Sequence, residues 1–419
     1  MRAAVLCALT VCLGSGAAWA QEEVSCQVQL DSVGGDGYRD ELGPGRIHLG
    51  GSGGVWFSCL GQRTTIYADS AAWYSELDRM DLVGSVQFRD SATALDTDRA
   101  RYFTVDERLE AYGNVRLENR QTGSVLVGPN LTYYREVPGV RDTTELYATA
   151  RPTVEYRSSQ DTSGAPYVIV GDRVRLIGDA VASAWGSVTI DREDFAAQGD
   201  SATLNTELGE GFLMGHAEAA GTDSASYTIS GRRVAFRLTD DALSWVQAQG
   251  LAQATSAEWQ MAGDTIEFNV ANDLIQGGGV WGDSTRPRAM SQSHTIVADS
   301  LALDAPDQVL TEVRGFGAAR ATTHADSLTT EADWMAGDTV VARFDSTEAG
   351  TRALVMLEAR GHAQAFYHIY DEDDRSLTPG VNYARGVRIT ARFKDDDLER
   401  VDVVDGDGIY LEPPGRRRP

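Results

Sequence analysis

Acidic residues that could serve as a catalytic pair recur along this chain of 419 residues. Asp69, Asp98, Asp200 and Asp264 each follow a small residue and precede two alternating apolar positions. Paired carboxylates are the groups with which glycoside-cleaving enzymes work. An Asp at the same place in every unit is, however, what a turn at the entry of a strand requires, because its side chain accepts hydrogen bonds from nearby backbone N–H groups. We therefore predict turn-forming aspartates and no catalytic residue.

The six histidines offer no other chemistry. They are scattered, and none stands at metal-ligand spacing from another histidine or a carboxylate of the same unit. His216 and His362 each follow a glycine of the repeat at an outward-pointing position, which predicts solvated surface side chains. The sequence also holds no nucleophile elbow, phosphate loop or dinucleotide fingerprint. We expect no enzyme, no bound metal and no cofactor. The histidines are His48, His216, His294, His324, His362 and His368.

The four cysteines indicate the compartment. Residues 1–20 are typical of a secretory signal peptide, with Arg2 before an apolar run and Ala18-Trp19-Ala20 as the cleavage pattern. Cys26 and Cys59 follow that segment, and in an oxidising compartment we expect them to form a disulfide. The alternative is two unpaired buried thiols. Zinc binding is not expected, because neither cysteine belongs to a C-x-x-C pattern. A bridge closes a loop of about 33 residues and contributes about 3–4 kcal/mol in the loop-entropy model.

The elements that carry these residues form a repeat of two short strands. In the first half of each repeat unit, a small residue and an Asp precede two alternating apolar positions, as in Ala68-Asp69-x-Ala71-x-Trp73. Roughly 15 residues later a glycine opens a second alternation, as in Gly84-x-Val86-x-Phe88 and Gly113-x-Val115-x-Leu117. Alternation with period two marks half-buried strands, and a period near 30 residues marks a stacked array. About ten units fit between Ile66 and Glu412, which predicts an elongated all-β stack almost without helices.

The charge balance excludes one class of partner. The chain has 62 acidic and 37 basic residues, and its formal net charge is −25. Such a chain is not expected to bind nucleic acid or an anionic membrane face through bulk electrostatics. Its charges lie mostly at outward-alternating positions, which indicates a solvated face that keeps an extended sheet soluble.

Two stretches of the repeat carry a family resemblance. One runs from Ala68-Asp69-Ser70-Ala71-Ala72-Trp73-Tyr74 to Leu82-Val83-Gly84-Ser85-Val86-Gln87-Phe88. The other runs from Thr97-Asp98-Arg99-Ala100-Arg101-Tyr102-Phe103 to Leu109-Glu110-Ala111-Tyr112-Gly113-Asn114-Val115. Both resemble the organic-solvent-tolerance-like (OstA-like) family, which includes the periplasmic LptA-type lipopolysaccharide-transport bridge. The likeness is strong from about 60 to 120 and looser to about 412, and this chain is longer and more acidic than a single bridge domain.

The resemblance implies a fold and a function. The fold is a β-jelly roll or "β-taco" of short antiparallel strands, in which two facing sheets enclose an apolar groove that holds lipid acyl chains. The function is a periplasmic scaffold that passes lipopolysaccharide or a similar amphipathic lipid toward the outer membrane. The expected partners are that lipid and other OstA-like or outer-membrane assembly proteins, bound by end-to-end stacking. The expected location is the periplasm, in association with the outer membrane.

The inward positions of the strands mix small and large apolar residues, and this mixture leaves two interpretations open. Small residues leave room between the sheets, which alkyl chains would fill at about 0.8 kcal/mol per buried methylene. Alternatively, the aromatic residues close the core and the chain is a structural or polysaccharide-binding or polysaccharide-acting β-solenoid, whose coils would pair parallel rather than antiparallel. The candidate groove residues are Trp73, Phe88, Tyr102, Val115, Leu117, Leu204 and Phe268.

The predicted division of the chain follows from these features. Residues 1–20 are the signal peptide, and residues 21–60 form an N-terminal flap tied down by the disulfide. Residues 61–412 form the repeat domain, in which the polar stretch 157–164 is either a long hairpin tip or a hinge. Residues 413–419 are expected to be a disordered basic tail.

Overall fold

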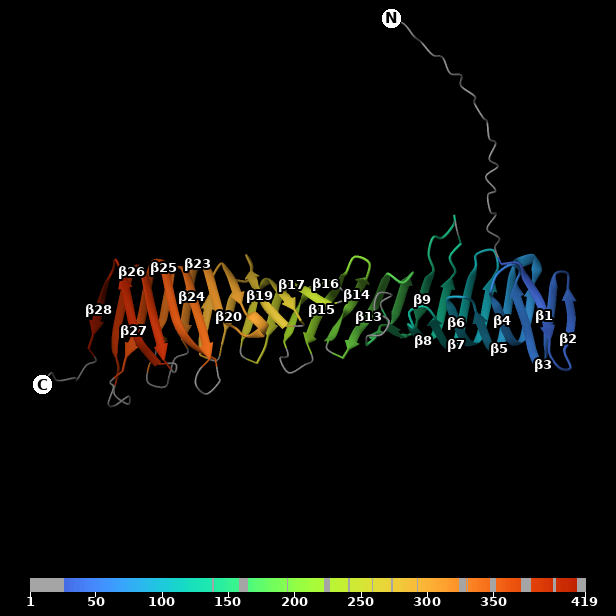
Figure 1. The fold of residues 1–419 in the computed structure, drawn as a ribbon, viewed down its shortest axis with the longest axis horizontal. Coiled ribbons are helices and arrows are strands. Elements are labelled where there is room, and N and C mark those ends of the chain that lie inside the picture. Colours follow the sequence, from blue (N-terminus) through green and yellow to red (C-terminus); the bar gives the residue numbers. More distant parts are fainter. Residues whose placement is uncertain are drawn as a thin grey trace, which may run out of the picture.

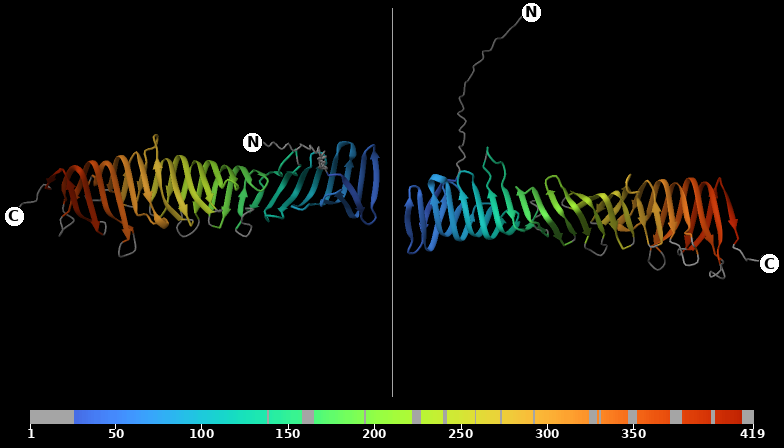
Figure 2. Two further views of the ribbon diagram at one scale, coloured as in Figure 1. Left: turned by 45° about the horizontal axis from the view of Figure 1, so that its top comes forward. Right: turned by 180° about the vertical axis from the view of Figure 1, so that it is seen from behind.

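The structure is a computed structural model in which the chain forms one elongated body, with its first and last strands at opposite ends (Figure 1, Figure 2). The predicted signal peptide, the predicted tail and the expected hinge beyond residue 157 lie outside the described residues. The described residues are 26–137, 139–157, 165–193, 195–221, 227–239, 242–257, 259–272, 274–291, 293–323, 329, 331–346, 352–370, 378–394 and 397–412.

Strands follow one another along the long axis of the body (Figure 1). The N-terminal strands are β1 (Val28–Val33), β2 (Tyr38–Gly43), β3 (Arg46–Cys59), β4 (Thr65–Tyr74), β5 (Arg79–Arg89), β6 (Thr93–Phe103), β7 (Arg108–Asn119), β8 (Val125–Tyr134), β9 (Glu145–Thr149) and β10 (Thr153–Tyr156). The central strands are β11 (Tyr167–Val170), β12 (Arg173–Ile177), β13 (Val181–Arg192), β14 (Phe195–Asn205), β15 (Glu210–Gly221), β16 (Thr228–Thr239), β17 (Ala242–Thr255), β18 (Gln260–Ala271), β19 (Leu274–Trp281) and β20 (Arg288–Met290). The C-terminal strands are β21 (His294–Val297), β22 (Ser300–Asp304), β23 (Glu312–Thr323), β24 (Trp334–Ser346), β25 (Arg352–Ile369), β26 (Gly380–Lys394), β27 (Asp397–Val404) and β28 (Asp407–Leu411). Within the described residues the helical elements are two single 3-10 turns, η1 (Ser75–Leu77) and η2 (Pro306–Gln308).

Each long strand pairs antiparallel with the next one in sequence. In some places two short strands take the place of one long strand and pair with the same long neighbour. β9 and β10 pair with β8 in this way, and β27 and β28 pair with β26. We call each long strand, or each such pair of short strands, a pass. Every strand pair in the described part of the chain is antiparallel. The prediction of an elongated, antiparallel all-β stack is confirmed, and a solenoid of parallel coils is ruled out for these residues.

Every long strand bends in its middle, so that its two halves lie in two facing sheets. Thr93, at the start of β6, pairs with Asn119 of β7. The preceding residue of β7, Glu118, pairs with Val125 at the start of β8, so the starts of β6 and β8 lie close together along the strand direction. If β8 were straight, Tyr133 would lie about 26 Å further along. Instead the Tyr133 hydroxyl lies 3.2 Å from that of Thr93. The opposite ends of neighbouring strands therefore meet, and the space between the halves holds one continuous apolar core.

The hairpin turns consequently form two rims that face each other across the open side of the stack. We call them rim A and rim B. Rim A carries the turns between β4 and β5, β6 and β7, β8 and β9, β12 and β13, β14 and β15, β16 and β17, β18 and β19, β22 and β23, β24 and β25, and β26 and β27. Rim B carries the turns between β3 and β4, β5 and β6, β7 and β8, β10 and β11, β13 and β14, β15 and β16, β17 and β18, β20 and β21, β23 and β24, and β25 and β26.

In β5, β7, β13, β15, β17, β23 and β25 the bend is made by the repeat glycine and the residue that follows it. Gly113 and Asn114 have φ values of 80° and 45°, which is left-handed backbone in the middle of a strand. Two such residues break the ladder and turn the chain, and glycine adopts this conformation without a Cβ penalty. The same two-residue corner occurs at Gly84–Ser85, Gly113–Asn114, Gly186–Ser187, Gly215–His216, Gly250–Leu251, Gly317–Ala318 and Gly361–His362.

The repeat aspartates lie at these corners, so the prediction that they form turns at strand entries is wrong for most of them. An Asp on the preceding strand, or directly before it, stands where a Cβ of the corner glycine would lie, because only glycine leaves space for the carboxylate. At the corners of Gly84, Gly113, Gly215 and Gly361 the side chain of the next residue bonds to this Asp, as Asn114 Nδ2 does to Asp98 at 2.9 Å. Asp264 differs, since it accepts the backbone N–H groups of Ser284 and Thr285. The aspartates that face a corner glycine are Asp69, Asp98, Asp172, Asp200, Asp299 and Asp338.

Replacing Gly113 with alanine is expected to lower the free energy of unfolding by about 1–3 kcal/mol. The new Cβ would lie 2.5 Å from Asp98 Oδ2 and would hold a left-handed φ. Gly61→Ala is the matched control, because Gly61 has a φ of 73° and no atom within 4 Å of the new Cβ. Urea denaturation measures both. Equal losses in the two variants would show that the corner carboxylate has no part in the effect.

The N-terminal segment 21–60, expected as a flap, forms the first strands of the stack from Val28 onward. β1 and β2 both pair with β3, which in turn pairs with β4. Glycines allow this close approach, since a Cβ on Gly34 would lie 2.6 Å from the Cα of Gly53. The array of strands therefore begins well before the clearest copies of the repeat.

Candidate functional site

The two rims are closed over the N-terminal third by a buried polar cluster. Glu107 on rim A is only 3% exposed. Its carboxylate accepts a hydrogen bond from the Tyr102 hydroxyl at 2.6 Å, one from Arg135 Nη1 at 3.0 Å, and one from the backbone N–H of Cys26. Arg135 also lies 3.7 Å from Asp90 of rim B. We call Glu107, Tyr102, Arg135, Asp90 and the Cys26 amide the rim lock.

Burial sets the protonation of the rim lock. It raises the pKa of Tyr102, and the negative charge of Glu107 raises it further. Burial and the carboxylate of Asp90 likewise raise the pKa of Tyr133 to about 12. For Arg135 burial lowers the pKa, but the combined electrostatic effect of Glu107, Tyr102, Asp90 and Tyr133 outweighs it and the pKa is raised. Both phenols therefore remain hydrogen-bond donors and the guanidinium remains charged near neutral pH.

The predicted disulfide is present and holds this end of the chain in place. Cys26 and Cys59 are bonded, and the two residues are 3% and 2% exposed. Because the Cys26 amide donates to Glu107, the disulfide and the rim lock are parts of one assembly. A disulfide is compatible with an extracytoplasmic location.

Further along the stack the rims are joined by fewer contacts. Asn119 Nδ2 on rim B donates to Asp179 Oδ1 on rim A at 2.8 Å. The hydroxyl of Tyr156 donates to the backbone oxygen of the same Asp179 at 2.6 Å. Leu117 lines a recess of about 500 Å³ beneath these bonds. Beyond this point the apolar core opens toward solvent.

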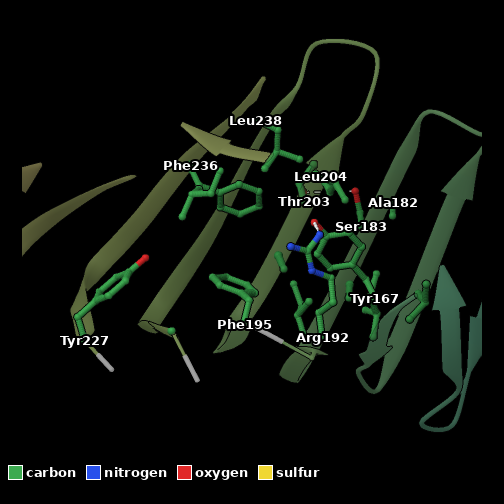
Figure 3. Close-up of a pocket in the computed structure, with 17 residues that line it drawn as sticks. Tyr167, Ala182, Ser183, Arg192, Phe195, Thr203, Leu204, Tyr227, Phe236 and Leu238 are labelled. Carbon is green, nitrogen blue, oxygen red and sulfur yellow. Dashed lines mark hydrogen bonds between the residues drawn. The ribbon is translucent and has the colours of Figure 1, made fainter. Parts of the chain in front are cut away.

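An apolar hollow lies between the rims over β11 to β17 (Figure 3). It encloses about 1110 Å³ of space between protein atoms, part of which is open to solvent. We call it the central hollow. The residues that line it are Tyr167, Ile169, Val174, Ala182, Ser183, Ala184, Ile190, Arg192, Phe195, Ala202, Thr203, Leu204, Gly221, Tyr227, Phe236, Leu238 and Leu243.

Small residues on the strands and large residues at the rims produce the central hollow. Ala184 and Ala202 are inward residues that pair across β13 and β14, and Ala182 lies two residues before Ala184; the short side chains of these alanines leave space above them. Phe195 of rim B and Phe236 of rim A approach from opposite sides, with ring centroids 6.4 Å apart. Because they are only half-buried, these rings present apolar surface at the opening. The arrangement is suited to holding an alkyl chain.

One charged residue lies among the described residues that line the central hollow, and it is Arg192. Its Nη1 donates to the hydroxyl of Tyr167 at 2.8 Å, and its guanidinium carbon lies 4.9 Å from the centroid of the Tyr167 ring. Figure 3 shows Arg192 between Phe195 and Tyr167. An apolar hollow with a cation at its edge matches an amphipathic ligand.

A second, smaller hollow lies between the rims near the C-terminal end, with about 440 Å³ of space. The rings of His294 on rim B and Phe393 on rim A meet across it, with centroids 6.3 Å apart. Trp334 and Phe366 also line it, stacked at 6.3 Å. Asp333 lies at its edge and is held by His368, whose Nδ1 is 2.6 Å from the carboxylate. We call it the C-terminal hollow.

The structure places the predicted groove residues in different surroundings. Phe88, Tyr102, Val115 and Phe268 have no exposed surface and lie in the filled core. Trp73 packs edge-on against Phe57, with ring centroids 6.3 Å apart. Of the predicted residues, Leu117 lines the recess beneath Asp179 and Leu204 lines the central hollow.

The rim residues of the hollows were missed in the sequence. Tyr167, Arg192 and Phe195 stand at the last inward positions before or after a rim B turn, and Phe236 stands near rim A. Large residues at the ends of alternating strands whose centres carry alanine, such as Ala182, were the available signal. Alternation alone does not say whether such residues meet above the core or stay apart.

The outer corners carry exposed His–Asp pairs. His216 Nδ1 lies 3.3 Å from Asp200, and His362 Nδ1 lies 3.0 Å from Asp338. The two histidine side chains are 92% and 89% exposed. In the described part of the chain, no group of three or more His, Cys, Asp or Glu residues is placed to hold a metal ion.

Comparisons with known proteins leave the family open. No protein-family model matches the chain, and no curated protein sequence matches it either. Among the described residues, no helix has the length and apolarity needed to span a bilayer. The case for a function therefore depends on the hollows and the rims.

Proposed function

We propose that this protein is a periplasmic scaffold of the OstA-like type that binds lipopolysaccharide or a similar amphipathic lipid between its rims and passes it toward the outer membrane. The observation that carries the proposal is the central hollow, where the apolar interior of the stack opens to solvent between aromatic side chains. Burial of an alkyl chain there would contribute about 0.8 kcal/mol per methylene. The C-terminal hollow is a second opening on the same side of the stack.

The ends of the stack support the proposed partners. β28 and β27 pair with β26, and β28 presents Ile409 and Leu411, which are 63% and 62% exposed. An edge strand with exposed apolar residues is a template for a further strand. Stacking with another OstA-like or outer-membrane assembly protein would cover it. The net charge of −25 argues against nucleic acid as a partner.

A structural role in the envelope is the second candidate. The rim lock favours it, because over the N-terminal third the interior is filled and the rims are bonded together. In that case the hollows would be packing defects of a long scaffold. Native mass spectrometry of protein taken from envelope extracts separates the candidates, since only a lipid carrier is expected to retain lipid.

A photo-crosslinking residue at Leu204 or Phe195 is expected to capture lipid in cells, because both side chains line the central hollow. The same residue at Asn205 is the control, since strand alternation sends it to the outer face. A probe at Phe88 is expected to capture nothing, because that position lies in the filled core. Mass spectrometry of the crosslinked products gives the result.

Two outcomes would contradict the proposal. Equal capture at Leu204 and Asn205 would indicate adhesion of lipid to the surface of the stack. Capture at neither position, in protein that folds normally, would favour the structural role.

A further inference from the structure

We propose that the outer face of the stack binds an extended, uncharged polysaccharide along a row of aromatic and polar side chains beside the corners. The row lies on the half of the strands that leads to rim A, and it faces away from the hollows, so the inference is independent of the proposed lipid function. We call it the outer row. Its members are Trp185, Ser201, Met214, Arg233, Gln249, Thr265, Trp281, Ser300 and Phe316.

The register of the strands is the first argument. Each member of the outer row pairs with the next one across neighbouring strands, from Trp185 on β13 to Phe316 on β23. Val280 is buried directly before Trp281, so alternation directs the row outward. The members on every second strand are large apart from one glutamine, and Trp185, Met214, Trp281 and Phe316 are 37%, 41%, 42% and 41% exposed. Such an alignment differs from apolar surface residues that are scattered singly.

The spacing of the large members is the second argument. Every second strand of a sheet recurs at about 9.6 Å, which is twice the distance between neighbouring strands. This distance is close to the length of one disaccharide in an extended chain of β-linked pyranose sugars. Trp185 and Trp281 are separated by three such steps, which matches a hexasaccharide. Because the row is one side chain wide, it fits a linear polymer better than a bilayer or a broad protein surface.

The setting of Trp281 is the third argument. Its indole lies over Gly279, where a Cβ would be 2.9 Å from both Cζ2 and Cη2 of the ring. Gly279 stands two residues earlier on β19 and therefore shares the outer face. The glycine lets the indole lean along the sheet while the residue stays 42% exposed. The face of an aromatic ring carries partial negative charge, which attracts the C–H groups on the face of a pyranose ring.

The polar groups indicate an uncharged ligand. The outer row contains no acidic residue, and apart from Arg233 its polar members carry hydroxyl or amide groups, which exchange hydrogen bonds with sugar hydroxyls. On the corner side it is flanked by Asp200 and Asp299, whose side chains are 65% and 68% exposed. Each of them contacts one basic neighbour, His216 or Arg286. Exposed carboxylates accept hydrogen bonds from hydroxyls and repel a polyanion.

Isothermal titration calorimetry of the purified protein with cellohexaose, chitohexaose and maltohexaose tests the proposal. The wild-type protein is expected to bind the two extended, β-linked hexasaccharides about tenfold more tightly than the curved, α-linked maltohexaose. Trp185→Ala and Trp281→Ala should each weaken binding of the β-linked probes about tenfold. Trp281→Tyr should retain most of the binding, because it keeps an aromatic ring over Gly279.

Trp56→Ala is the matched control. Trp56 is 43% exposed on the outer face of β3, but it pairs with Tyr67 on the rim B half, outside the outer row. That variant should bind as the wild type does, and urea denaturation checks that every variant is folded.

Three results would overturn the inference. The first is a wild-type protein that binds none of the hexasaccharides, and the second is one that binds maltohexaose as tightly as cellohexaose. The third is unchanged binding in both Trp185→Ala and Trp281→Ala. Self-association of the wild type that is lost in Trp281→Ala, without sugar binding, would assign the outer row to a second copy of this chain. All of these results leave the proposed lipid function standing.

Discussion

Replacing Glu107 with alanine is expected to lower the free energy of unfolding by about 3–5 kcal/mol. The change removes the acceptor for the Tyr102 hydroxyl, for Arg135 and for the Cys26 amide, all of which lie inside the closed N-terminal third. Arg135 is half-buried, and a largely desolvated cation that loses its partner costs more than the pair contributed, because water only partly replaces the lost carboxylate. Urea denaturation followed by circular dichroism measures the loss.

The exposed pair of Arg385 and Asp407 provides the control for this prediction. Its charged atoms are 2.7 Å apart, but the two side chains are 68% and 66% exposed. Asp407→Ala should therefore leave the denaturation midpoint nearly unchanged. Glu107→Gln keeps an acceptor oxygen without the charge and should lie between the two. If Glu107→Ala and Asp407→Ala had equal effects, the rim lock would not be a source of stability.

Removal of the disulfide in a Cys26→Ala, Cys59→Ala double variant is expected to cost about 3–4 kcal/mol. The bond closes a sequence separation of 33 residues, so its loss gives the unfolded chain more freedom. Loss of the disulfide also releases the Cys26 amide from its fixed place beside Glu107. The same urea titration measures the effect, with the triple variant that adds Glu107→Ala completing the comparison.

The two losses should not be additive, because both act on the same end of the stack. The triple variant is expected to lose less than the sum of the two separate losses. Thiol labelling of the purified protein under denaturing, non-reducing conditions checks the premise that the two cysteines are bonded. Labelling of both Cys26 and Cys59 would contradict it.

Period-two alternation in the sequence was enough to predict the strands and their inward faces. It placed Val115 and Leu117 inside, and both are buried. It did not show the corner between the halves of β7. Ala111 and Val115 are both inward, with Gly113 and Asn114 between them, so the two corner residues keep the parity of the pattern. Because inward and outward residues alternate in the same order on both sides of the bend, the period-two pattern of the sequence does not reveal it. The repeat glycines were for this reason expected at the beginnings of strands and not at their middles.

The candidate site was harder to predict, because it depends on contacts between rims rather than on any one strand. Glu107 and Arg135 lie in separate turns of rim A, and Asp90 lies on rim B. In the sequence they are ordinary charged turn residues. The same limit applies to Arg192, whose inward direction follows from alternation but whose aromatic surroundings come from β11 and β14.

The pairing of each pass with its neighbour in sequence has a consequence for how the chain reaches its native state. Contacts between adjacent passes join residues a few tens of positions apart, as Val181 and Asn205 are joined across β13 and β14. Little loop-closure entropy is lost at each step, so structure can propagate pass by pass from a nucleus. The N-terminal third, which holds both the covalent bond and the buried ions, is the best place for that nucleus. Kinetic defects in the variants of Glu107 should therefore appear as slow refolding of the entire stack.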